Sequence, residues 1–249
     1  MIKALIKRRF WLWKNRLLST ISLVFLLPVI FSLLVVLPLK NIILYSLSGV
    51  LYEIWVYPGL IYFITSIGLF PLLYRDFFDL RIHNKLLINI SLTPYSKSNI
   101  IFSYLSCSII ESIIFGILAA SIYSLFIPEN FEFFQYLFFL ILLILHLFLL
   151  GNLFISFCLI INSITIMWIT TLCFFIFIMF GNSFIIQLEF FPPILEIILK
   201  YQPFSFSYQV FNRFLSIDII DWKLIAINLF LIYIWIILNG YILRKKFQQ

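Results

Sequence analysis

Charged residues are scarce in this chain. Only 11% of its 249 residues are Asp, Glu, Lys or Arg, whereas 64% are hydrophobic. A water-soluble globular protein has about 25% charged and about 45–50% apolar residues, so this composition excludes that class. A soluble helical core would also need helices with charged outer faces, which the apolar runs here do not have. The composition therefore predicts a protein that lies in a membrane.

Cysteine, glycine and histidine are also rare, and each shortage excludes a kind of site. Cys107, Cys158 and Cys173 have unrelated spacings that suit neither a disulfide framework nor a metal site. None of the seven glycines is followed by Lys, which excludes the phosphate-binding loop G-x-x-x-x-G-K-[ST]. The two histidines fit neither H-E-x-x-H nor a catalytic triad. We expect no catalytic, cofactor or metal site here, and any ATP would bind to another chain.

Long apolar runs are abundant. Six of them reach the length of about 20 residues that a helix needs to cross a bilayer. The runs cover residues 20–39, 55–74, 100–127, 133–157, 164–186 and 223–243. They predict one all-α membrane domain over residues 1–249, without an appended soluble domain. The first run is too long for a cleaved signal peptide.

The fourth and fifth runs are too long together for one span. A helix over both would measure about 80 Å at 1.5 Å per residue, far more than a bilayer. We expect the chain to turn near Asn162 and Ser163, with Gly151 and Asn152 as the alternative.

Positive charge gathers on one side of the predicted spans. With the N-terminus in the cytoplasm, all but four of the seventeen Lys and Arg residues lie inside. The four outside are Lys40, Lys200, Arg213 and Lys223. The reverse orientation would invert the positive-inside bias. We therefore expect both termini in the cytoplasm, and we attribute the net charge of +7 to topology rather than to a nucleic-acid partner.

Residues 1–18 have the pattern of an interfacial helix. One apolar stripe recurs at steps of three and four residues, through Ile2, Ile6, Phe10, Trp13 and Leu17. Cationic residues flank it on both sides: Lys3, Lys7 and Lys14 on one, Arg9 and Arg16 on the other. The stripe can sink into the headgroup region while the cations reach water and anionic lipid. The alternative is a simple positive-inside anchor.

Residues 75–99 form the longest predicted cytoplasmic connection. The middle of this segment has helical potential, and Thr93-Pro94 should end that helix because the residue before proline is pushed out of the α region. Together with the Arg75-Asp76 pair, the segment predicts a compact structured knob on the cytoplasmic side.

Residues 187–221 contain two apolar stretches that are too short to cross a bilayer. Pro192, Pro193 and Pro203 interrupt them, and proline in a first turn favours a new helix. Stretches of this length are typical of re-entrant or interfacial segments. We expect two short helices that dip into the outer leaflet, against protein or a wet cavity.

Two ionisable residues, Glu111 and His146, lie near the middle of the third and fourth runs. A charge there costs about 2.5–3.5 kcal/mol, so we expect burial within the bundle and pairing. One hypothesis is a proton relay or a substrate contact. The other, which we favour, is a structural hydrogen bond between the two residues, worth about 0.6–2 kcal/mol.

This layout resembles the ABC-2 type permeases, the membrane subunits of ABC exporters for polysaccharides, drugs and lipids. The segment IKRRFWLWKNRLLS resembles the elbow helix of the family. Arg75-Asp76 followed by Leu92-Thr93-Pro94 resembles its "R-E … L-x-x-T-P" coupling loop, with Asp in place of the usual Glu and without the usual glycine.

A third segment carries the resemblance most specifically. Residues 191–214 resemble the segment "P-x-x-L … P-L-x-x … R" between the last two spans of the family. The matching positions are Pro193, Leu195, Pro203 and Arg213.

The resemblance implies a six-span subunit that forms a dimer, with a second copy or a paralogue, around a central pathway in a bacterial inner membrane. It also implies two cytoplasmic ATPase subunits, which bind ATP and Mg²⁺ and dock on a coupling region at Arg75, Asp76, Thr93 and Pro94. The substrate stays open among glycans, lipids and drugs. Outer aromatic residues are expected to pack rather than to stack on sugars: Phe184, Phe190, Phe191, Phe204, Phe206 and Tyr208.

Two other functions are weighed against this one. A proton-coupled secondary transporter could use Glu111 and His146, but such folds commonly contain internal repeats, and the two halves of this chain are not similar. An intramembrane enzyme would need a convergent cluster of nucleophile, base or metal ligands. The spans offer too few such residues. An associated ATPase would distinguish the exporter from both alternatives.

Overall fold

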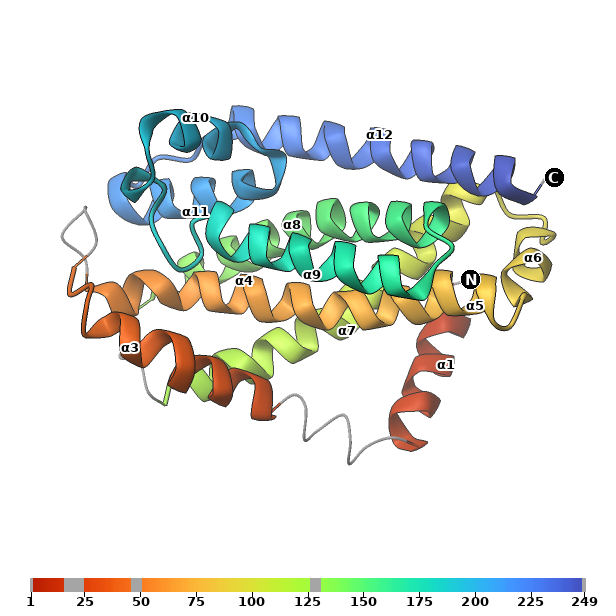
Figure 1. Cartoon of the computed structure of the whole chain (residues 1–249), viewed down its shortest axis with the longest axis horizontal. Coiled ribbons are helices and arrows are strands. Elements are labelled where there is room, and N and C mark those ends of the chain that lie inside the picture. Colours follow the sequence, from red (N-terminus) through yellow and green to blue (C-terminus); the bar gives the residue numbers. More distant parts are fainter. Residues whose placement is uncertain (1, 16–24, 46–50, 126–130, 248–249) are drawn as a thin grey trace.

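The computed structural model describes residues 2–15, 25–45, 51–125 and 131–247, and these fold almost entirely into helices (Figure 1). The predicted all-α class is confirmed. Five helices are long and apolar enough to cross a membrane: Tyr52–Ile82, Lys97–Tyr123, Phe133–Ile160, Ile164–Gly181 and Trp222–Lys246. This is the pattern of a multi-pass membrane protein.

The first predicted span is described only in part. Its described residues form a shorter apolar helix, Phe25–Lys40, which includes a π-helical segment, η1 (Ser32–Val36), and ends in α3 (Leu37–Lys40). Residues 16–24, with the predicted stripe residue Leu17, lie outside the described part of the chain. The part of the chain that the structure describes therefore contains five candidate spans, where the sequence predicts six.

The second span is longer than predicted. Helix α4 (Tyr52–Leu73) continues into a π-helical segment, η2 (Tyr74–Asp79), and then into α5 (Leu80–Ile82). The predicted start of a loop at Arg75 is therefore wrong. The apolar surface does not end there, because Phe77 and Phe78 are buried. A buried partner also compensates the charge of Asp76, as shown below.

Helix α4 lies at the centre of the bundle. In the most apolar stretch of its span, 83% is buried inside the protein. The corresponding share is only 22% for α9 (Ile164–Gly181) and for α12 (Trp222–Phe247). Helices α7 (Lys97–Tyr123) and α8 (Phe133–Ile160) pack directly on α4. The outer faces of α9 and α12 are left for lipid or for another chain.

The two predicted connecting regions lie at opposite ends of the bundle. Helix α6 (Leu86–Ser91) and the C-terminus lie at one end, which we call the α6 end (Figure 1). Helices α10 (Pro193–Tyr201) and α11 (Phe206–Ile217) lie at the other, the α10 end. Helix α1 (Ile2–Asn15) packs against α7. The bundle thus separates α6 from α10 and α11, and the sides of the membrane on which these two regions lie stay a prediction.

The turn between α8 and α9 occupies residues 161–163, so the turn predicted at Asn162 and Ser163 is confirmed. Two cations hold it. Arg81 Nη1 donates to Asn162 Oδ1 at 2.8 Å, and Lys246 Nζ donates to the same oxygen at 3.2 Å. Cations near the C-terminus of a helix interact favourably with its dipole. This turn therefore joins α5, α8 and α12 at the α6 end.

The alternative turn site is part of a polar network inside the bundle. Asn152 lies within α8, and its backbone oxygen and Oδ1 accept hydrogen bonds from Asn239 Nδ2 of α12, at 2.9 and 3.2 Å. Ser156 Oγ donates to Asn239 Oδ1 at 2.7 Å and accepts from Trp235 Nε1 at 2.9 Å. Hydrogen bonds of this kind hold helices together where lipid removes the hydrophobic driving force.

The two short helices predicted at the α10 end are present. Pro193 occupies the first turn of α10, and Pro203 begins the 3₁₀ turn η4 (Pro203–Ser205) that leads into α11. Gln202 Nε2 donates to Asn182 Oδ1 at 2.7 Å and so ties this break to the end of α9.

Close backbone contact at Gly59 gives a test of this packing. An added Cβ at Gly59 would lie 2.2 Å from the backbone oxygen of Phe184, whereas one at Gly181 would meet only side chains, the nearest atom being Leu199 Cδ2 at 3.1 Å. Because backbone cannot move aside cheaply, Gly59→Ala should lower the free energy of unfolding by about 1–3 kcal/mol or more. Gly181→Ala should cost less. Chemical unfolding in detergent measures both, and equal losses would contradict this packing.

Candidate functional site

Helix α1 presents one face to the protein and another away from it. Leu5 and Arg9 are buried, while Ile6 and Phe10 are exposed. Trp13 stacks on Phe115 of α7, with ring centroids 5.5 Å apart. The predicted helix is present, but the side chains that face the bundle and those that face away differ from the prediction. Ile6 and Phe10 remain available to lipid, whereas Arg9 points into the bundle instead of reaching water.

Arg9 meets two carboxylates on two different spans. Its Nη1 donates to Glu111 Oε2 of α7, and its Nη2 donates to Asp76 Oδ2 of η2. Nη2 also donates to Ser108 Oγ at 2.8 Å. Trp13 Nε1 donates to Glu111 Oε1. We call these five residues the Arg9 cluster, and it fastens α1 to the two most closely packed spans.

The Arg9 cluster is buried and electrically balanced. Relative exposure is 8% for Arg9, 1% for Asp76 and 6% for Glu111. Arg75 Nε lies 3.5 Å from Asp76 Oδ1 and supplies a second positive charge, so two cations face two anions. Removal of one partner from a buried ion pair costs about 3–5 kcal/mol, because the remaining charge is left without compensation.

The predicted hydrogen bond between Glu111 and His146 is not formed. His146 Nδ1 lies 3.1 Å from the backbone oxygen of Phe204, and its Nε2 lies 3.1 Å from Ser66 Oγ. The physical reason is that Arg9 offers Glu111 a charge-assisted hydrogen bond, which is stronger than one from a neutral imidazole. His146 instead joins α8 to α4 and to the η4 turn.

The predicted coupling residues separate into two places. Asp76 is buried in the Arg9 cluster, so its placement on an exposed knob is wrong, and Arg75 is partly buried beside it. Thr93 and Pro94 are exposed at the α6 end, as expected. Thr93 Oγ1 donates to the backbone oxygen of Ile90 at 2.7 Å and so helps to close the end of α6.

Arg9 is the functional residue that the sequence did not reveal. The available signal was chemical: Asp76 and Glu111 lie in or beside apolar runs, where a carboxylate is costly unless a cation lies next to it. Such acids need a positive partner. A basic residue on the amphipathic N-terminal helix was the nearest source, but the sequence alone does not show which one turns inward.

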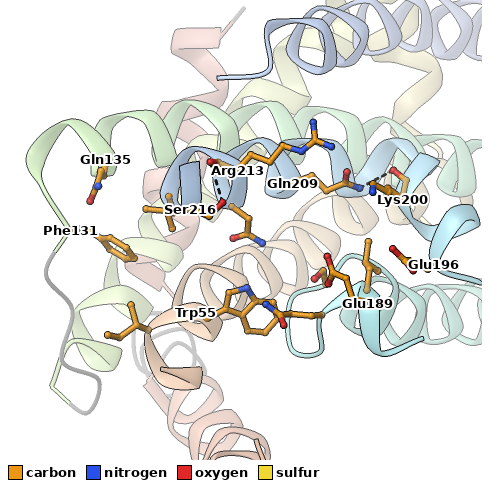
Figure 2. Close-up of a pocket in the computed structure, with 15 residues that line it drawn as sticks. Trp55, Phe131, Gln135, Glu189, Glu196, Lys200, Gln209, Arg213 and Ser216 are labelled. Carbon is orange, nitrogen blue, oxygen red and sulfur yellow. Dashed lines mark hydrogen bonds between the residues drawn. The ribbon is translucent and has the colours of Figure 1, made fainter. Parts of the chain in front are cut away.

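A pocket of about 490 Å³ opens at the α10 end, between the first turns of α4 and α8 and the helices α10 and α11. Ligand sites commonly have volumes of about 300–1,000 Å³. Trp55 lies on one side of the pocket, and Gln209 and Arg213 lie across from it (Figure 2). Of the predicted residues at this end, Arg213 lines the pocket, whereas Pro192, Pro193 and Pro203 shape the helices around it.

The outer aromatic residues mostly pack, as expected. Phe184 and Tyr208 are fully buried and lie in edge contact, with ring centroids 5.1 Å apart. Both also contact Tyr62. The aromatic residues that do line the pocket, Trp55 and Phe131, were not among those singled out from the sequence.

Substitution of Arg9 tests the cluster. Arg9→Met should lower the free energy of unfolding by about 3–5 kcal/mol, because it leaves two buried carboxylates with one half-buried arginine. Lys7→Met removes the same charge from an exposed position two residues away and should change stability by less than about 0.5 kcal/mol. Chemical unfolding in detergent provides the measurement. If both variants lost a similar free energy of unfolding, Arg9 would contribute no more than an exposed lysine, and the buried cluster would not explain stability.

Comparisons with known proteins assign no family. No family model, no curated protein and no solved structure matches the chain. The function must therefore be inferred from the residues and contacts described above.

Proposed function

We propose that this chain is the permease subunit of an ATP-driven exporter of the ABC-2 type. In this proposal it has six spans and two cytoplasmic termini, and it lies in a bacterial inner membrane. It forms the transport pathway with a second copy or a paralogue. Separate ATPase subunits bind ATP and Mg²⁺ and supply the energy.

The observation that carries the proposal is an exposed apolar surface at the α6 end, outside the bundle. Leu86, Leu92 and Tyr95 are exposed, Leu92 at 78%. Lys85 and Lys97 flank them, which favours a position beyond the hydrocarbon core. Exposed apolar side chains with a polar rim are typical of a protein interaction site. A cytoplasmic ATPase is the partner that an exporter would bind there.

The contacts behind this surface offer a route for motion. Helix α6 follows α5 and η2 directly in the chain. Asp76 of η2 binds Arg9 of α1, and Arg81 of α5 binds the turn between α8 and α9. A displacement of α6 would therefore reach α1, α7 and α8 together. This connectivity supports a role as a coupling element, which needs a discrete structural link between the sites.

Charge supports the orientation. Basic residues gather at the α6 end, including Lys85, Lys97 and the tail Arg244-Lys245-Lys246. Most of the acids that the structure describes lie toward the opposite end: Glu53, Glu132, Glu189, Glu196, Asp218 and Asp221. The positive-inside rule then favours a cytoplasmic α6 end. In that orientation α10 and α11 face the exterior, where we propose that they dip into the outer leaflet.

The contacts give the proton-coupled alternative no specific support. Glu111 is engaged by Arg9 and Trp13, and His146 by Ser66 and a backbone oxygen. A relay would need a connected path between the two, and no hydrogen bond joins them among the residues that the structure describes. We therefore assign both residues structural roles within the exporter.

Leu92→Glu tests the ATPase contact. A buried, uncompensated carboxylate in the interface should reduce co-purified ATPase activity per permease by about tenfold or more, a cost of at least about 1.4 kcal/mol. The activity is measured on tagged permease solubilised from its native membrane. Leu125→Glu is the control, since Leu125 is equally exposed but lies beyond the far end of α7.

Two outcomes would contradict the proposal. One is wild-type permease that brings down no ATPase activity above the background of an untagged preparation. The other is an equal effect of Leu92→Glu and Leu125→Glu, which would place the interface elsewhere.

A further inference from the structure

The pocket at the α10 end carries charges of both signs. Glu189 and Glu196 line it, and so do Lys200 and Arg213. Arg213 Nη1 donates to Asp221 Oδ2 at 2.6 Å, so that cation is already balanced. Glu189, Glu196 and Lys200 form no ion pair with any residue that the structure describes. The pocket thus offers two carboxylates and one ammonium group to a ligand.

Helix α10 places these charges beside an apolar surface. Glu196 and Lys200 face the pocket, while Ile194, Ile198 and Tyr201 of the same helix are exposed. Gln209 Nε2 donates to the backbone oxygen of Lys200 at 2.8 Å, which fixes α10 against α11. A helix with a charged face and an exposed apolar face is typical of the boundary between headgroups and acyl chains. Exposed Tyr also favours that depth.

We propose that this pocket binds the zwitterionic headgroup of an amphiphile, of the phosphoethanolamine type, with the acyl chains along the exposed face of α10. The ligand ammonium lies between Glu189 and the Trp55 ring, where carboxylate and indole both attract a cation. The ligand phosphate lies toward Lys200, whose ammonium group supplies hydrogen-bond donors. The site does not depend on the proposed ATPase partner.

Other headgroup classes fit the pocket less well. A net anionic headgroup would bring its charge against Glu189 and Glu196, and a purely cationic one would meet Lys200. A neutral sugar would desolvate these three charges without pairing them, which is costly. A zwitterionic headgroup brings its cation to the carboxylates and its anion to Lys200, so neither of its charges has to face only its own sign.

Binding to the purified chain in a non-ionic detergent tests the proposal. The probes are dihexanoyl phosphatidylethanolamine, dihexanoyl phosphatidylglycerol, glycerophosphoethanolamine and octyl glucoside. The first should bind about tenfold more tightly than the others, because each of the others lacks a charge-assisted contact or the apolar chains. Phosphatidylglycerol tests the charge preference, and glycerophosphoethanolamine, which keeps the zwitterionic phosphodiester, tests the contribution of the chains. If any of the other three probes bound as tightly as dihexanoyl phosphatidylethanolamine, the proposal would be overturned.

Matched charge substitutions locate the site. Glu189→Gln and Lys200→Gln should each weaken binding of dihexanoyl phosphatidylethanolamine by about tenfold. Asp218→Asn and Lys223→Gln make the same charge changes near the α10 end but outside the pocket, and should leave binding unchanged. Equal losses in the pocket and control variants would reject this pocket as the site. Because no ATPase is present, the result is separate from the test of the exporter proposal.

Discussion

The buried guanidinium of Arg9 is the contact on which the rest of the structure depends. Two carboxylates, Asp76 and Glu111, lie inside an apolar bundle, and one cation from the N-terminal helix binds both. Without that cation, either acid would carry a large penalty for leaving water. The same interaction keeps α1 against α7 and allows the second span to continue as a helix beyond Arg75. One face of α1 is thereby fixed to the bundle, while Ile6 and Phe10 stay exposed.

Much of the fold could be predicted from the sequence, because bilayer thickness and hydrogen-bond satisfaction leave few options. Length alone predicted that the fourth and fifth runs must turn, and Asn162 and Ser163 were placed correctly. The prolines predicted the short helices α10 and α11. The predicted start of the connection at residues 75–99 is too early, because the second span continues as a helix through Arg75 and Asp76 to Ile82. Burial and a distant partner decide that point, and neither is visible in a local pattern.

The sites were harder to predict than the fold. Glu111 and His146 were rightly expected to be buried with partners, yet their partners come from segments far apart in the chain: Arg9 and Trp13 for one, Ser66 and Phe204 for the other. The pocket at the α10 end draws on α4, α8, α10 and α11 at once. Such convergence depends on tertiary packing, which spacing along one helix does not encode.

The central claim is that buried Arg9 compensates the charges of Asp76 and Glu111. One comparison of stabilities tests this claim most directly. The double variant Arg9→Met, Glu111→Gln removes one charge of each sign and keeps the ion pair between Asp76 and Arg75, whereas Arg9→Met alone leaves two carboxylates facing one cation. Because the loss comes from uncompensated charge, the double variant should recover most of the free energy of unfolding that the single variant loses, about 3–5 kcal/mol. A double variant that is no more stable than Arg9→Met would contradict the account.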